Sequence, residues 1–155
     1  MPGFQNSPPL SIGGSITPLI FHSGGAAPAN IVETGVPFHV HTQFTVTGAG
    51  AIALGGKFKV NVSFEGLGAS APEVDLATET VKVVSSPVAF PGGVPTRSYN
   101  VVSNVPLGFA VPGAYEMIAT VTHVTDDAIP LPGPIAGYSD EQIVQFFPNS
   151  PATTP

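Results

Sequence analysis

Charged residues are scarce in this sequence, which has four Lys or Arg and ten Asp or Glu among 155 residues, or 9%. An ordinary soluble domain carries about 25%. Charged side chains usually cover the surface that faces water. Much of this surface must therefore consist of hydroxyl, amide and backbone groups, or be buried against other protein. The second possibility points to self-association.

Basic residues are the scarcer charged type, and the net charge is −6 at pH 7. A protein that binds nucleic acid or an anionic membrane needs a basic patch to neutralise phosphates. We therefore expect neither partner. Cysteine and tryptophan are absent, and the lack of cysteine excludes disulfides and thiolate metal ligands.

The first 32 residues contain no Asp, Glu, Lys or Arg. A secretory signal needs a basic start and about 7 to 15 unbroken apolar residues, but proline and glycine interrupt every apolar run here. No stretch approaches the ~20 apolar residues of a transmembrane helix, so we expect no membrane insertion. The composition favours an extracellular or cell-surface location, although no signal peptide is visible.

Apolar and polar side chains alternate strictly over residues 38–47 and 57–65. A period of two predicts strands with one face on a core. With the strand that begins near Tyr115, these segments give a predicted core of Phe38, Val40, Phe44, Phe58, Val60, Val62, Phe64, Tyr115, Met117 and Val121. The polar face of the second strand, which should point away from that core, comprises Lys57, Lys59, Asn61 and Glu65.

Further short strands are predicted between Gly and Pro punctuation. They span residues 74–76, 80–84, 98–103, 114–124 and 142–147, and a shorter β-like piece spans 16–21. No segment predicts a helix. Several short strands separated by turns indicate one all-β domain, an antiparallel sandwich rather than βαβ units.

The segment from Pro112 to Val121 resembles the sixth strand of immunoglobulin-like and fibronectin-like domains, in which a Pro-Gly corner precedes a Tyr. The resemblance implies that the Tyr115 hydroxyl bonds to backbone upstream. Without a Cys pair or a core Trp, the chain is not of the antibody type. We expect an all-β, antiparallel immunoglobulin-like β-sandwich over residues 33–147. An extended arm over 1–32 precedes it, and an irregular Pro/Thr-rich tail over 148–155 follows it.

The uncharged N-terminal arm carries apolar side chains on a segment too interrupted to form its own core. These candidate assembly residues are Leu10, Ile12, Ile16, Leu19, Ile20 and Phe21. The arm could add a strand to the sheet edge of a neighbouring copy, as in donor-strand complementation. It could equally fold back as the first strand of its own sandwich, because consecutive elements usually pack together.

Two residue groups have partial metal-binding patterns. His39 and His41 share a strand face and could chelate Zn, Cu or Ni if His22 or His123 supplied a third ligand. Only two ligands stand together, so we expect no tightly bound metal; on a partner surface the pair would instead confer pH sensitivity. The loop acids Asp126 and Asp127 offer two carboxylates, whereas calcium takes about 6 to 8 oxygens. No calcium site and no cofactor are expected.

No catalytic motif with a supporting context is present; the Gly-x-Ser-x-Gly elbow, for example, is absent. We therefore expect a non-enzymatic protein. The composition favours a structural subunit that self-assembles into a fibre, sheath, shell or surface layer, with itself as partner in a homo-oligomer or filament. The alternative is a monomeric immunoglobulin-like binding module that holds a carbohydrate, peptide or ion in its end loops.

Overall fold

A computed structural model describes residues 13–22, 29–34, 36–68, 73–105 and 112–148. The strands are β1 (Ile16–His22), β2 (Ile31–Glu33), β3 (Phe38–Thr47), β4 (Lys57–Gly66), β5 (Val74–Asp75), β6 (Glu79–Lys82), β7 (Thr96–Asn104), β8 (Gly113–Val124), β9 (Pro132–Tyr138) and β10 (Gln142–Phe147). The helical elements are α1 (Ala49–Ala53) and the short 3-10 turns η1 (Val83–Ser85) and η2 (Pro91–Gly93). The expectation of an all-β fold is confirmed.

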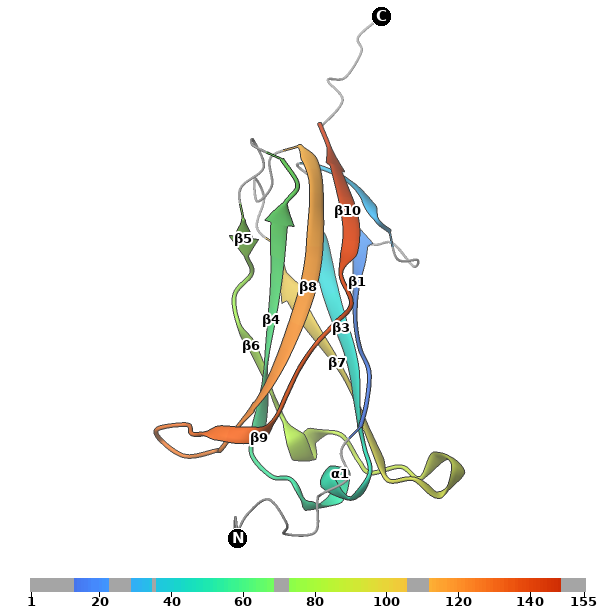
Figure 1. The fold of residues 1–155 in the computed structure, drawn as a ribbon, viewed down its shortest axis with the longest axis vertical. Coiled ribbons are helices and arrows are strands. Elements are labelled where there is room, and N and C mark those ends of the chain that lie inside the picture. The colour runs from blue at the N-terminus through green and yellow to red at the C-terminus, as the bar shows by residue number, and fades with distance from the viewer. Residues whose placement is uncertain (1–12, 23–28, 35, 69–72, 106–111, 149–155) are drawn as a thin grey trace, which may run out of the picture.

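The strands form two sheets that face each other along the long axis of the molecule (Figure 1). Sheet A has the order β1-β3-β7. Sheet B has the order β2-β10-β8-β4-β5, with β6 also paired to β4 and β9 also paired to β8. Neighbouring strands are antiparallel, apart from the parallel pair β2 and β10.

The alternating sequence places the core as predicted. All ten residues named above as core are buried, and Phe58 is 0% exposed. On the opposite face of β4, Asn61 and Glu65 are exposed, and Lys57 and Lys59 are partly so. The sandwich core therefore follows from period-two patterning, with the long strands β3, β4 and β8 contributing alternate side chains to the interior.

The interior divides into two apolar clusters. One cluster, nearer the end where β10 terminates, includes Val40, Tyr115 and Phe146. The rings of Tyr115 and Phe146 meet edge to face, with their centroids 5.2 Å apart. The other includes Phe44, Phe58 and Tyr99, whose ring centroids lie 4.8 to 5.4 Å apart. Such ring pairs add to the stabilisation that apolar burial gives.

Two buried hydroxyls, those of Thr42 and Ser103, belong to neither cluster. Thr42 lies on β3 between Val40 and Phe44, which belong to different clusters, and Ser103 is two residues beyond Val101 on the adjacent β7. Neither hydroxyl has a hydrogen-bond partner among the described residues. The boundary between the two clusters therefore contains buried polar groups, which are costly to leave unpaired.

The prediction of no helix is wrong at Ala49–Ala53. Alanine favours helix, and α1 is closed by bonds from Ala51 N to Gly48 O and from Leu54 N to Gly50 O, with the Ala51 side chain in the core. None of the helices in the described ranges is long and apolar enough to span a membrane.

The segment at 16–21 forms β1, which pairs with β3 of the same chain. Of the two possibilities left open for the arm, the single chain therefore adopts the internal strand. Leu10 and Ile12 lie outside the described residues. The tail is described only at Pro148, and the hydroxyl bond expected of Tyr115 stays a prediction.

Candidate functional site

The outer face of sheet A is built from side chains that alternate with the core residues of its three strands. Sheet pairing brings them together from segments far apart in the sequence. We define this outer face by the residues Ser15, Thr17, Leu19, Phe21, His39, His41, Gln43, Thr45, Thr47, Thr96, Ser98, Asn100, Val102 and Asn104. It presents hydroxyl, amide and imidazole groups with a few apolar side chains, and none of its members is an acid, Lys or Arg.

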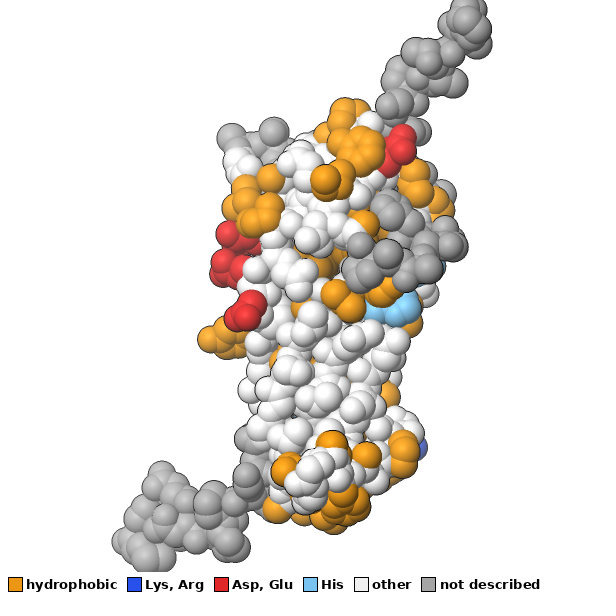
Figure 2. All heavy atoms as spheres, turned by 90° about the vertical axis from the view of Figure 1, so that its right-hand side faces the viewer, with side chains coloured by type: hydrophobic (Ala, Val, Ile, Leu, Met, Phe, Trp, Pro, Cys, Tyr) orange, Lys and Arg blue, Asp and Glu red, His pale blue; other side chains and the backbone are white. Residues whose placement is uncertain are grey.

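The charges of the molecule lie almost entirely elsewhere. All ten acids, together with Lys57, Lys59 and Lys82, are on strands of sheet B or on the loops that join those strands. Only Arg97 belongs to sheet A, where it shares the inward side of β7 with Tyr99. Its guanidinium donates to the carbonyl oxygens of Ala51 and Ser86. Figure 2 views the molecule from the side on which β1 lies in Figure 1, and the surface there is mostly uncharged.

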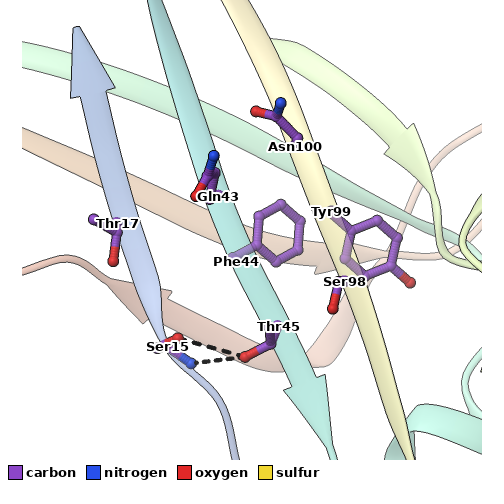
Figure 3. Close-up of a pocket in the computed structure, with 8 residues that line it drawn as sticks. All are labelled: Ser15, Thr17, Gln43, Phe44, Thr45, Ser98, Tyr99 and Asn100. Carbon is purple, nitrogen blue, oxygen red and sulfur yellow. Dashed lines mark hydrogen bonds between the residues drawn. The ribbon is translucent and has the colours of Figure 1, made fainter. Parts of the chain in front are cut away.

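A shallow hollow of about 480 Å³ crosses this face. Ser15 and Thr17 line it from the β1 side, Gln43 and Thr45 from β3, and Asn100 and its neighbours from β7 (Figure 3). The Ser15 N and Oγ atoms lie 3.3 and 3.4 Å from Thr45 Oγ1. Hydroxyls and amides both donate and accept hydrogen bonds, so the hollow suits a neutral polar partner.

The two histidines considered as metal ligands, His39 and His41, lie on this face and contact asparagines of β7. His39 Nδ1 is 3.0 Å from Asn104 Oδ1. His41 Nδ1 is 3.4 Å from Asn100 Nδ2, and the His41 ring packs on Phe21 with centroids 4.6 Å apart. The histidines thus help to tie β3 to β7 on the outer face.

Of the two third ligands considered above, His123 is not brought to this pair. His123 is buried on the inner side of sheet B, where Nε2 donates to Gly55 O at 2.6 Å. The His22 side chain is not described. Within the described ranges, no three His, Asp or Glu side chains gather as a metal site would require.

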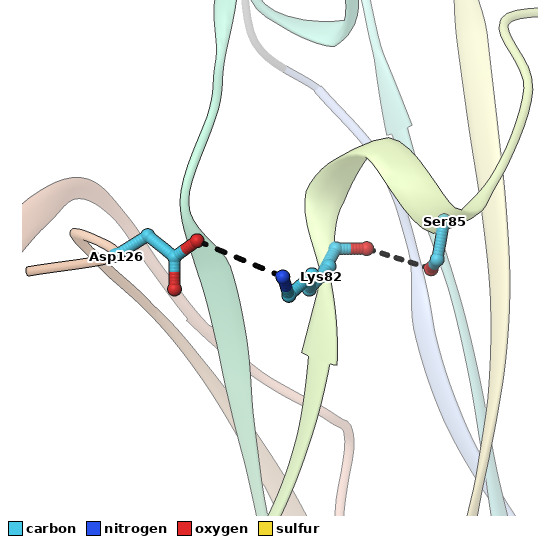
Figure 4. Close-up of polar contacts among 3 residues, drawn as sticks. All are labelled: Lys82, Ser85 and Asp126. Carbon is cyan, nitrogen blue, oxygen red and sulfur yellow. Dashed lines mark hydrogen bonds and ion pairs between the residues drawn. The ribbon is translucent and has the colours of Figure 1, made fainter.

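The two acids considered as calcium ligands, Asp126 and Asp127, lie in the exposed turn between β8 and β9. Asp126 Oδ2 is 3.9 Å from Lys82 Nζ (Figure 4), with both side chains more than half exposed. Asp127 is also exposed. An exposed pair of this kind contributes little to stability, and it joins the β8–β9 turn only loosely to β6.

The described arm residues are divided between the core and the outer face of sheet A. Ile20 is 1% exposed in the first cluster, and Ile16 packs against both clusters. Leu19 and Phe21 point to the outer face and are partly buried. The arm thus contributes part of its apolar surface to its own domain.

Sequence reasoning missed two surfaces. Residues 34–56 and 98–115 contain no Asp, Glu, Lys or Arg, but only the β1-β3-β7 pairing shows that the strands within them share one face. The second surface consists of exposed apolar side chains at the end of the molecule that carries α1, η1, η2 and the β8–β9 turn (Figure 1). These are Ile52, Val84, Phe90, Val94, Ile129 and Leu131.

No protein-family model matches the chain, and none of the curated proteins shows significant sequence similarity to it.

Proposed function

We propose that the protein is a non-enzymatic structural subunit that assembles with copies of itself, and that the outer face of sheet A is an assembly surface. The observation that carries this proposal is the separation of charge between the two sheets. With a net charge of −6, two copies that meet through sheet B bring like charges together, which is unfavourable. Two copies that meet through sheet A do not.

The chemistry of the face supports the same proposal. Its Ser, Thr, Asn and Gln side chains are donors and acceptors at once, so the same surface on a second copy can satisfy them. Such a contact requires no complementary partner of opposite charge. Repeated contacts between copies would build the fibre, shell or layer that the composition favours.

We also propose that the sandwich is immunoglobulin-like, as the resemblance around Tyr115 implies. In such domains the first, second and fifth strands share one sheet, and the third, sixth and seventh share the other. The order β1-β3-β7 against β10-β8-β4 supports this assignment. Tyr115 near the start of β8 then occupies the place of the corner tyrosine.

The proposed assembly surface can be tested by placing a charge on the outer face of sheet A. Gln43→Glu changes an exposed side chain at the centre of β3 with little change in shape, and it sets like charges close together in a face-to-face contact. Asn61→Asp, exposed on the outer side of β4, is the matched control. By sedimentation velocity over a concentration series, we expect Gln43→Glu to weaken association about tenfold or more and Asn61→Asp to leave it unchanged. A wild-type protein that stays monomeric at the highest concentration contradicts the proposal.

The second candidate function is a monomeric binding module that uses its end loops. This function is favoured by the exposed apolar side chains at the end of the molecule that carries α1, η1, η2 and the β8–β9 turn. They include Phe90, which is 59% exposed, and Ile129, which is 79% exposed. Exposed apolar groups on loops often mark binding sites. A monomeric mass at every concentration, with a peptide or glycan ligand whose binding is lost in Phe90→Ser, would favour this function.

A further inference from the structure

The two edges of sheet A differ in how their backbone groups are satisfied. In antiparallel sheets, successive residues direct their N–H and C=O groups alternately to one side and the other. Thr45 N bonds to Ser15 O at 3.1 Å and Gly48 N to Pro95 O at 2.9 Å. Odd residues of β3 therefore bond to β1, and even residues bond to β7. The even residues of β7 then point their backbone groups away from β3, to the outer edge.

Among the described residues, this outer edge of β7 is covered at one end only. Thr96 exchanges two backbone bonds with Ala89, at 2.7 and 2.8 Å, and Ser98 N bonds to Ser86 Oγ at 3.2 Å. Beyond them, the outward N–H and C=O groups of Asn100, Val102 and Asn104 have no hydrogen-bond partner in the structure as described. In the immunoglobulin arrangement, a fourth strand would occupy this position.

The opposite edge is blunted. On β1 the backbone groups of the even residues point away from β3, toward the free edge of the sheet. Pro18 is one of these residues, and because proline has no N–H, it cannot donate a bond to a neighbouring strand. The next outward carbonyl, that of Ile20, accepts Ala29 N at 2.8 Å. Proline is a usual means of protecting an edge strand. Between Tyr99 and Asn104, β7 has neither Pro nor Lys.

We propose that the open edge of β7 pairs antiparallel with the same edge of a second copy, about a two-fold axis at Val102. Val102 then faces its own counterpart, and Asn100 faces Asn104 of the other copy. Only this register uses all three unpaired residues, because a shift toward the N-terminus of β7 requires Ser98, whose N–H is occupied. About six main-chain hydrogen bonds form, and the two copies of sheet A become one continuous sheet.

Side chains at this contact do not oppose the pairing. The side chains of Asn100, Val102 and Asn104 lie on the uncharged outer face of sheet A. The side chains between them that point to the core, such as that of Val101, are already buried. No like charges stand opposite each other, which in a sheet would be destabilising. The contact closes on itself as an isologous dimer. It rests on the proposed self-association and identifies one contact within it.

The experiment uses the full chain and three substitutions at one position. Val102→Pro removes the N–H that points to the free edge and breaks no hydrogen bond within sheet A. The edge of β7 then lacks a donor at this position, as the edge of β1 does at Pro18. Val102→Lys keeps the N–H but sets two like charges together. Val102→Ala, the matched control, keeps the N–H and adds no charge. Sedimentation velocity gives the association constants, circular dichroism checks folding, and amide exchange is measured at 100, 102 and 104.

We expect Val102→Pro to weaken the dimer about 10- to 100-fold, since the two bonds at the axis are lost. Val102→Lys should also weaken it, and Val102→Ala should change it little. The three amides should exchange more slowly as concentration rises. If Val102→Pro fails to fold, Val102→Lys decides the outcome. If Val102→Pro and Val102→Lys associate as strongly as the wild type, and all three amides of the wild type exchange rapidly at every concentration, this contact is overturned and the proposed assembly still stands. A wild type that is monomeric throughout overturns both.

Discussion

At the scale of single residues, Tyr99 links the core to the loop that follows β6. Its ring is 6% exposed and stacks on Phe44, and its hydroxyl donates to Val83 O at 2.6 Å. Burial raises the pKa of Tyr99 above 10.0, and the Arg97 cation opposes this shift only in part. The folded state therefore holds the phenolic proton at a pH where the unfolded chain has lost it.

This shift predicts a loss of stability in alkali. Below pH 10 both states are protonated and the contribution is complete; as pH rises through the folded pKa, the free energy of unfolding falls. Urea denaturation between pH 9 and 11 should show a steeper decline for the wild type than for Tyr99→Phe. Tyr138→Phe, at a site 80% exposed, is the control and should decline as the wild type does. If the free energy of unfolding falls equally with pH in the wild type and in Tyr99→Phe, the raised pKa of Tyr99 does not contribute to the loss of stability in alkali.

At the scale of elements, the entry into β1 depends on a glycine. Gly14 has φ 150°, and a Cβ there would lie 1.9 Å from the Thr45 carbonyl oxygen. Close approach of the two backbones lets Gly13 exchange bonds of 3.1 and 3.0 Å with Thr47. The start of β1 therefore needs a residue without a side chain.

We expect Gly14→Ala to lower the free energy of unfolding by at least about 1 kcal/mol, because the clash must move one strand from the other. Gly55→Ala is the matched control: a Cβ there meets no atom within 4 Å, so its effect should stay within about 0.5 kcal/mol. Urea denaturation of the three proteins measures both. Equal stability of all three would show that β1 can begin without this close approach.

The sequence predicted the elements whose signal is local. Alternation over β3 and β4 gave both the strands and their inward faces, because a period of two is a property of neighbouring residues. The strand β9 was missed because its Pro132, Gly133 and Pro134 are typical of turns; it lies at an edge, where a missing N–H is tolerated. The three residues of β2 pair with β10 from the far end of the chain, a contact that no local pattern contains.

The candidate site was harder to predict for a related reason. Each uncharged stretch was visible in the sequence, but the sheet to which a strand belongs is decided by long-range pairing. His39 and His41 were correctly placed on one strand face. Their neighbours Asn100 and Asn104 come from β7, some sixty residues away.

At the scale of the whole molecule, the separation of charge predicts how salt affects association. Repulsion between copies with a net charge of −6 opposes assembly, and the Debye length falls from about 10 Å at 0.1 M salt to about 3 Å at 1 M. If uncharged faces and backbone edges meet, association should strengthen as NaCl is raised over this range. Light scattering or sedimentation measures it. Weaker association at high salt would indicate contacts made by ion pairs.

The two proposed contacts, one on the face of sheet A and one at the edge of β7, are different two-fold contacts, and together they generate an open assembly unless the copies close into a ring. An edge contact at β7 alone closes as a dimer, and a face contact on sheet A alone does the same. If both proposed contacts form, each copy holds two neighbours, so that growth continues along a line.

The placement of every acid on the sheet B side would also limit growth of the proposed assembly in one direction. If two neutral faces meet as proposed, the sheet B sides, to which all ten acids belong, are turned outward on both sides of the pair. A third molecule approaching from above encounters like charge, whereas one arriving at the rim does not. In the proposed assembly, electrostatics would thus limit the thickness to two molecules, and growth would continue only along the length of the chain of copies.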